Sequence, residues 1–222
     1  FLMLNGLDAA LKECFREELA GLADCLTIDV TLGDSLNKEP IPLFAPSRQS
    51  LPNSEFFYFH LLNQCRRLIL GRSGLTIILL DDSYLLRQLA SELAGEFGTR
   101  VTCETIPRAV NGVICCTCAW WMAYHNQLPI PDQLIIAILP FPNLESPLVS
   151  ARVESFKRQG RDWFRGFLFP EMLSLLSSIT STIRGKKVRL AILDGRLKRR
   201  SWGTDVFRSL EPWYPLNHLL PN

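Results

Sequence analysis

The chain has 222 residues, of which 47% are hydrophobic and 21% are charged, proportions typical of a soluble globular protein with one large domain. No apolar run reaches the roughly 18 residues that a transmembrane helix needs, so a membrane-spanning protein is not expected. The formal net charge of +2 hides an asymmetry: residues 1–104 hold 9 Lys/Arg against 14 Asp/Glu, whereas residues 105–222 hold 15 against 8. The chain begins with Phe1 rather than Met, which indicates a piece of a longer protein.

The chain contains seven cysteines, an odd number. This favours reduced, buried thiols in a cytoplasmic protein over a disulfide framework. Cys115-x-x-Cys118 has the spacing of a metal-binding pair, but a second pair of Cys or His at metal spacing is missing. Two positions three apart on a strand also point to opposite faces of the sheet, so no metal site is expected.

The first elements along the chain are a helix and a strand. Residues 7–22 have leucines and a phenylalanine spaced three and four apart, which predicts an amphipathic helix. Residues 25–32 alternate in the manner of a strand and end at Gly33. Residues 35–53 are rich in Pro, Ser and Asn, so we expect an extended connector there and a domain boundary.

Helices and strands then alternate. Aliphatic runs predict strands at residues 75–80, 101–104, 112–118, 133–139 and 188–193. The helical period predicts helices at residues 54–70, 83–97, 146–159, 170–183 and 204–210. Asp82 or Ser83 is the expected N-cap of the second of these helices, and Gly98 its end. This alternation predicts an α/β fold with a mostly parallel sheet between two layers of helices.

Sequence motifs for nucleotide binding are incomplete. A phosphate-binding loop reads G-x-x-x-x-G-K-[ST], and Gly185-Lys186 is the only Gly-Lys pair. Lys187 follows it where Ser or Thr is needed, and Thr180 stands where the first Gly belongs. The chain therefore contains no complete site for a nucleoside triphosphate.

Basic residues concentrate between positions 184 and 200. They are Arg184, Lys186, Lys187, Arg189, Arg196, Lys198, Arg199 and Arg200, and Asp194 is the one acid among them. Such a cluster is the electrostatic signature of contact with a nucleic-acid backbone. A solvated surface that keeps the protein soluble explains the charge equally well.

Several segments together resemble the C-terminal motor domain of DinG/XPD-type DNA helicases. Residues 134–142 form a buried run that ends in Leu139-Pro140-Phe141-Pro142, and Pro147 to Arg152 follow in the family's Leu-Pro-Phe-x-x-Pro-x-Asp-Pro-x-x-x-Ala-Arg pattern. Residues 27–32 resemble the strand that closes the first motor domain, and residues 74–84 resemble the start of the second. Residues 193–196, 202–203 and 209–212 resemble the family's closing Leu-Asp-x-Arg, Tyr-Gly and Ser-Leu-Pro.

The resemblance implies a RecA-like domain of the P-loop NTPase type at residues 51–222. Residues 1–50 would then be a remnant of the first motor domain with its connector. It also implies single-stranded nucleic acid as a partner, the first motor domain of the parent protein as another, and a bacterial, DNA-associated location in the cytoplasm. The family uses ATP and Mg²⁺, but this chain lacks the Walker motifs, so it is not expected to bind a cofactor alone.

The departures from the family concern its charged motif residues. Counting back from Leu139, Trp121 matches the Trp of the family's Trp-Glu-Gly motif, whereas Met122, Ala123 and His125 replace its Glu, Gly and Asp. Ser178 falls near the Gln of the family's Gln-Gly-x-Gly-Arg motif, and Thr182 near its arginine. That arginine stabilises charge on the transferred phosphoryl group, so its loss predicts little or no hydrolysis.

Three features have two interpretations each. Arg184 is either a displaced finger arginine or a cation that complements a helix C-terminus. Trp120 and Trp121 either stack on bases or pack against the sheet. The basic and aromatic residues between 152 and 167 form either a nucleic-acid surface or an amphipathic helix pair.

The sequence therefore predicts a nucleic-acid-binding helicase domain without ATPase activity of its own. The expected contacts are Arg184, Lys186, Lys187, Lys198, Arg199 and Arg200. The alternative functions are a degenerate helicase domain that binds other proteins, the divergent second domain of an active helicase, and an unrelated small-molecule enzyme on a similar sheet.

Overall fold

A computed structural model of the chain describes residues 39–70, 72–107 and 111–216. The helix and strand predicted at residues 7–22 and 25–32 lie outside these residues. None of the helices within the described ranges is both long and apolar enough to cross a membrane.

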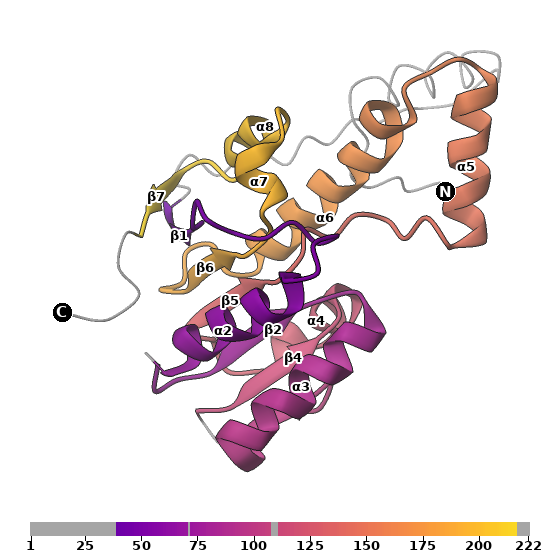
Figure 1. The fold of residues 1–222 in the computed structure, drawn as a ribbon. Helices are drawn as coiled ribbons and strands as arrows, with labels where there is room; N and C mark the ends of the chain where they lie inside the picture. Colours follow the sequence, from indigo (N-terminus) through magenta and orange to yellow (C-terminus); the bar gives the residue numbers. More distant parts are fainter. Residues whose placement is uncertain (1–38, 71, 108–110, 217–222) are drawn as a thin grey trace, which may run out of the picture. The chain divides into compact units, whose positions relative to one another are not determined.

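The described residues form a single parallel sheet of seven strands, in the order β3-β4-β2-β5-β6-β1-β7 (Figure 1). The strands are β1 (Ile41–Phe44), β2 (Thr76–Leu79), β3 (Val101–Cys103), β4 (Val113–Cys116), β5 (Gln133–Ile136), β6 (Arg189–Ile192) and β7 (Trp213–Pro215). The helices are α2 (Phe57–Leu70), α3 (Ser83–Phe97), α4 (Cys118–Tyr124), α5 (Pro147–Arg158), α6 (Phe169–Ser181), α7 (Arg196–Arg199) and α8 (Gly203–Ser209). A π-helical turn, Phe164–Leu168, precedes α6.

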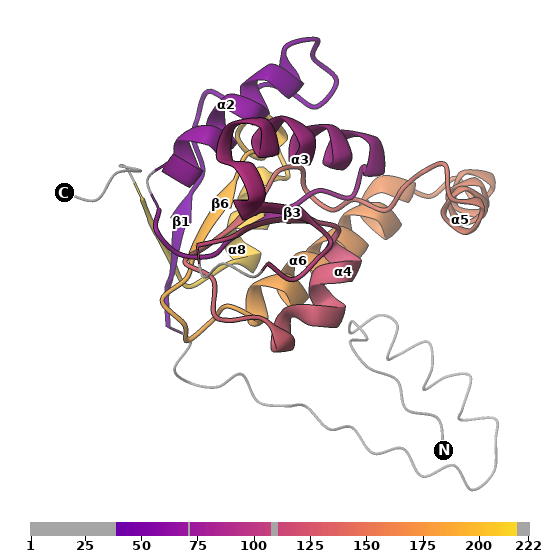
Figure 2. The ribbon, with the colours of Figure 1, turned by 90° about the horizontal axis from the view of Figure 1, so that it is seen from below.

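Helices cover both faces of the sheet, as the aliphatic strands predict. Ile77 and Leu79 of β2 belong to one core with α4, α6 and α8, whereas Ile78 belongs to a second core with α2 and α3. Successive side chains of a strand point to opposite faces, so each central strand contributes to both cores. Figure 2 shows the resulting three layers, with α2 and α3 on one side and α4, α6 and α8 on the other.

The chain crosses the sheet in two directions. From β1 through β2 to β3 it moves toward one edge with α2 and α3 on one face, and from β4 to β7 it moves back with its helices on the other face. The neighbouring strands β2 and β5 are therefore followed by connections that leave in opposite directions. In sheets of this kind a crevice opens at the carboxyl ends of such a strand pair.

The predicted α/β three-layer fold is confirmed, and several elements match closely. The α3 helix spans residues 83–97 as expected; Asp82 Oδ1 accepts hydrogen bonds from the N–H groups of Tyr84 and Leu85, 3.0 and 2.9 Å away. Gly98 ends the helix with a φ of 64°, in the left-handed region that glycine adopts most readily.

Two elements differ from the prediction. The expected strand at residues 112–118 ends at Cys116, because the Thr117 hydroxyl accepts a hydrogen bond from Trp120 N and starts α4. The Pro-rich segment assigned to the connector contains β1, which lies between β6 and β7.

The domain that contains the sheet therefore begins before residue 51. Gln49 is 3% exposed, and a Cβ atom added at Gly195 would lie 2.6 Å from the carbonyl oxygens of Gln49 and Ser50. Residues 41–50 thus pack within the same sheet domain rather than forming an extended linker.

Gly203, the first residue of α8, permits a close approach between α7 and α8. A Cβ atom at this position would lie 1.9 Å from the Leu197 carbonyl oxygen, whereas one at Gly95 in α3 would meet no atom within 4 Å. We expect Gly203→Ala to lower the free energy of unfolding by about 1–3 kcal/mol because the backbone of α7 must shift. Gly95→Ala should raise it by up to about 1 kcal/mol, because alanine is the better helix former.

Urea unfolding of both variants checks this prediction. Equal unfolding midpoints for Gly203→Ala and Gly95→Ala would contradict the close approach of α7 and α8.

Candidate nucleic-acid interface

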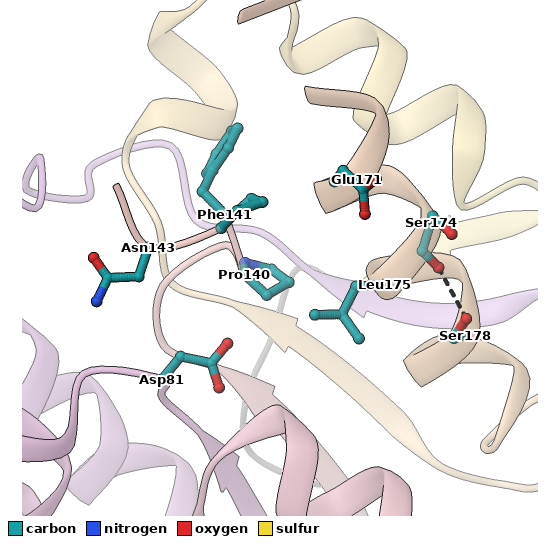
Figure 3. Close-up of a pocket in the computed structure, with 9 residues that line it drawn as sticks. Asp81, Pro140, Phe141, Asn143, Glu171, Ser174, Leu175 and Ser178 are labelled. Atoms are coloured by element: carbon teal, nitrogen blue, oxygen red, sulfur yellow. Dashed lines mark hydrogen bonds between the residues drawn. The ribbon is translucent and has the colours of Figure 1, made fainter. Parts of the chain in front are cut away.

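A cavity of about 520 Å³ opens at the carboxyl ends of β2 and β5, where the crevice is expected. Asp81 follows β2, and residues 140–143 follow β5. On the other side, α6 contributes Glu171, Ser174, Leu175 and Ser178 (Figure 3). The charged residues among the lining are Asp81 and Glu171, so the cavity repels phosphate groups.

A buried carboxylate fixes the corner beside this cavity. Asp194, 2% exposed, accepts a hydrogen bond from Leu139 N at 3.0 Å and forms a salt bridge with Arg196 Nη2 at 2.7 Å. The Arg196 guanidinium in turn lies 4.8 Å from the centre of the Phe141 ring. Asp194 thereby joins the end of β6 to the Leu-Pro-Phe-Pro corner after β5.

Trp121 and Thr182, two positions of the altered family motifs, contact each other. Trp121 is 2% exposed, and its Nε1 donates a hydrogen bond to Thr182 Oγ1 at 3.2 Å. The Thr182 hydroxyl donates to the Ile179 carbonyl at 2.7 Å. This contact joins α4 to the C-terminal end of α6, so the packing interpretation of Trp121 is confirmed.

Of the remaining altered positions, Met122, His125 and Ser178 make contacts within the domain, and Ala123 faces solvent. His125 Nδ1 lies 3.2 Å from the Met122 carbonyl, and Met122 packs against the core. Ala123 is exposed, and the Ser178 hydroxyl donates to the Ser174 carbonyl at 3.0 Å. None of these side chains supplies the charge that the family has at the same position.

Arg184 ties α6 to the segment after α8. Its guanidinium donates hydrogen bonds to the carbonyl oxygens of Leu210, Glu211 and Pro212 at 2.7, 3.1 and 3.3 Å. These bonds give the guanidinium a structural role, but they go to the segment after α8 and not to the helix C-terminus that the second interpretation named.

Strand β6 separates the predicted basic cluster into two groups. Lys186 and Lys187 precede the strand, whereas Lys198, Arg199 and Arg200 follow it. β6 has four residues and spans roughly 13 Å, so one group lies beyond its amino end and the other beyond its carboxyl end. Lys186 Nζ donates to the Thr182 carbonyl at 2.7 Å, and Lys198 Nζ lies 4.5 Å from the centre of the Phe207 ring. Arg199 and Arg200 are exposed.

At the carboxyl ends of β2 and β3, away from β6, the side chains Asp81 and Glu104 are acidic. Asp81 Oδ1 accepts from Cys118 N at 2.7 Å, and Glu104 Oε1 accepts from Thr117 Oγ1 at 2.7 Å. Both carboxylates thus stabilise the start of α4, and Asp82 caps α3. A phosphate backbone at this edge is attracted to the β6 end and repelled from the β2–β4 end.

The buried cysteines are structural. Burial raises the pKa of the Cys65 thiol to about 12 and also raises the thiol pKa values of Cys115, Cys116 and Cys118. Within the described residues, no three side chains of His, Cys, Asp or Glu gather into a group that could hold a metal ion.

No protein-family model matches the chain. Over 160 residues it is 26% identical to the ATP-dependent DNA helicase YoaA of Escherichia coli (strain K12), a match that covers 66% of this chain and 25% of that protein. YoaA of Haemophilus influenzae is 29% identical over 121 residues, covering 53% of this chain and 19% of that protein. Both matches agree with the resemblance to DinG/XPD-type helicases. The chain matches 25% of the length of the E. coli helicase and 19% of the length of the H. influenzae helicase.

A solved structure agrees with this relationship at the level of the fold. The structure of S. tokodaii Xpd4 matches 80% of this chain and 40% of its own, with a TM-score of 0.55 and 13% sequence identity. The seven-stranded parallel sheet of this chain therefore shares its fold with part of that structure.

The residues that line the cavity do not fit the phosphate groups of ATP. Both charged residues of the cavity lining are acidic, and Thr182, near the finger position, is held by Trp121. Phosphates require basic groups or backbone N–H groups directed at them.

We expect Asp194→Asn to lower the free energy of unfolding by about 3 kcal/mol, because it removes the charge of a buried pair. The control Asp205→Asn breaks the exposed pair of Asp205 with Arg208, 3.0 Å apart, and should cost less than about 1 kcal/mol. Urea unfolding gives both values. A change for Asp194→Asn no larger than for the control would show that the buried pair does not stabilise the corner.

Proposed function

We propose that the chain is the nucleic-acid-binding second motor domain of a DinG-like helicase and that it does not hydrolyse ATP by itself. The observation that carries this proposal is the separation of charges at the carboxyl edge of the sheet. Lys198, Arg199 and Arg200 are basic and exposed after β6, whereas both charged residues that line the crevice, Asp81 and Glu171, are acidic.

The absence of hydrolysis follows from the altered motif positions. Met122, Ala123, His125, Ser178 and Thr182 include neither a carboxylate nor a guanidinium, the charged groups of the family's motifs. Arg184, the nearest arginine to the finger position along α6, donates to the carbonyls after α8. In the parent protein this chain would contribute one wall of the nucleotide cleft, and the first motor domain the other.

The basic group after β6 supports nucleic-acid binding. Its three side chains extend from α7 and the following residue, next to the Leu-Pro-Phe-Pro corner that Asp194 fixes. Lysine and arginine side chains on a rigid element bind a phosphate backbone through charge and hydrogen bonds, without reading sequence.

A protein-binding scaffold is the second candidate function. Phe56, Phe59 and Leu70 on and beside α2 are 70%, 64% and 69% exposed. Phe56, just before α2, and Phe59, in its first turn, are close in sequence, and exposed apolar side chains that form a patch occur at protein interaction surfaces.

The purified chain should release no phosphate from Mg-ATP above the buffer background, with or without single-stranded DNA. The reason is that the side chains available for γ-phosphate charge are absent from the altered positions. A phosphate-release assay with E. coli YoaA as the positive control measures this. Saturable, DNA-stimulated release by this chain would overturn this part of the proposal.

Binding to fluorescent single-stranded DNA should weaken linearly on a plot of log affinity against log salt. The triple variant Lys198→Ala/Arg199→Ala/Arg200→Ala should flatten the slope by about 2, because each phosphate contact contributes about 0.7 for a single strand. Lys186→Ala/Lys187→Ala, at the other end of β6, should leave the slope unchanged.

Fluorescence anisotropy across a salt series gives these slopes. Absence of binding at low salt, or binding independent of salt, would reject nucleic-acid contact and favour the scaffold.

A further inference from the structure

Four aromatic side chains, here called the aromatic hub, lie between α7 and the helical segment that follows β5. They are Phe141, Phe164, Phe169 and Trp202. The Trp202 ring lies 5.6 Å from Phe141, 6.1 Å from Phe164 and 5.6 Å from Phe169, measured between ring centres. Phe164 is also 5.8 Å from both Phe141 and Phe169. The hub therefore packs the residues after α7 against the π-helical turn.

The segment of residues 147–168, here called the arm, contains α5 and the π-helical turn. Figures 1 and 2 show α5 standing out from the sheet in both views. The arm has a small core of its own, with Val153, Phe167 and Leu168 buried. Its aromatic residues thus serve packing, as the amphipathic interpretation of this segment expects.

The basic side chains of the arm point to solvent instead. Lys157, Arg158, Arg161 and Arg165 are all exposed, and Asp162 is the one acid between residues 157 and 165. Asp162 Oδ1 accepts from Phe164 N and Arg165 N, so it caps the turn. Lys157 Nζ donates to Glu154 at 2.9 Å, a contact that lowers the pKa of the Glu154 carboxyl. Asp162 is thus the one carboxylate within residues 157–165, set against Arg158, Arg161 and Arg165.

Stacking on a ring holds one of these arginines. The Arg161 guanidinium lies 4.7 Å from the centre of the Phe156 ring, in the geometry of a cation–π contact. A guanidinium held in this way loses less rotamer freedom on binding and keeps a planar set of N–H donors, which suits the bidentate binding of phosphate. The neighbouring π-helical turn is of a kind found frequently at functional sites.

We infer that the arm forms a second nucleic-acid contact, continuous with α7 across the aromatic hub. This inference rests on the proposed function and extends it. A single strand bound at Arg199 and Arg200 would pass the hub and reach Arg165, next to Phe164, and then Arg158 and Arg161. The partner is the phosphate backbone of single-stranded nucleic acid, bound irrespective of its sequence.

The continuity of the two basic groups favours nucleic acid over a small anion. Arg165 directly follows Phe164 of the hub, and Arg200 is two residues before Trp202, whose ring lies against Phe164. Each group is therefore close in sequence to a ring of one packed aromatic cluster, and an extended polyanion with a charge at each nucleotide is long enough to contact both.

The test compares an arm variant, Arg158→Gln/Arg165→Gln, with the control Arg67→Gln/Arg87→Gln on the exposed surfaces of α2 and α3. Both remove two exposed arginines, and Arg161 stays in place to keep its contact with Phe156. The probes are fluorescent oligonucleotides of about 4 and about 16 nucleotides, the range that one domain-sized site covers. Anisotropy is measured across a salt series.

We expect the arm variant to flatten the salt slope by about 1.4 with the long oligonucleotide. It should have no effect with the short one, which can occupy α7 alone, and the control variant should behave as wild type with both. Arg158→Lys/Arg165→Lys should restore the slope, which shows that charge rather than folding is measured. Matching urea midpoints for the variants exclude unfolding as the cause.

The outcomes separate the two proposals. If the arm variant equals wild type with the long oligonucleotide while the α7 triple variant is weakened, the arm inference fails and the proposed function stands. If wild type binds neither oligonucleotide, the proposed function fails. Polyglutamate bound as tightly as the long oligonucleotide would overturn the assignment of nucleic acid as the partner.

Discussion

The carboxylate of Asp194 is the constraint on which the carboxyl edge of this domain depends. It is buried between the ends of β5 and β6 and bonds to Leu139 N and to Arg196 at the same time. A buried ionised carboxylate is stable only with such partners, so its position fixes theirs. The Leu-Pro-Phe-Pro corner, the Phe141 ring beneath Arg196 and the start of the arm all follow from it.

Much of the fold could be predicted because local signals and tertiary packing agree. The α3 helix has an aspartate cap, an apolar face and a terminal glycine, and the structure has all three where the sequence places them. β1 was missed because its prolines favour an extended linker, whereas pairing with β6 and β7 decides that this segment is a strand. α4 was missed because Cys115 and Cys116 suggest a longer strand, and a single hydroxyl at Thr117 ends it.

The candidate site was harder to predict because closeness in sequence is not closeness in space. The run of basic residues from 184 to 200 looks like one cluster, but β6 passes through it and separates its two ends. Arg184 also looks available for phosphate until its contacts with three carbonyls are seen. Conversely, Arg165 and Arg200 are 35 positions apart in the sequence, and only the packing of Phe164 on Trp202 brings their neighbourhoods together.

The hydrogen bond from Trp121 to Thr182 limits which side chains position 182 can carry. An arginine at position 182 would leave the buried indole N–H of Trp121 without its acceptor and would place a guanidinium against α4. An unsatisfied buried donor costs about 1–3 kcal/mol, a large part of the stability of a single domain. Position 182 is therefore restricted to side chains that can accept the Trp121 hydrogen bond and fit against α4.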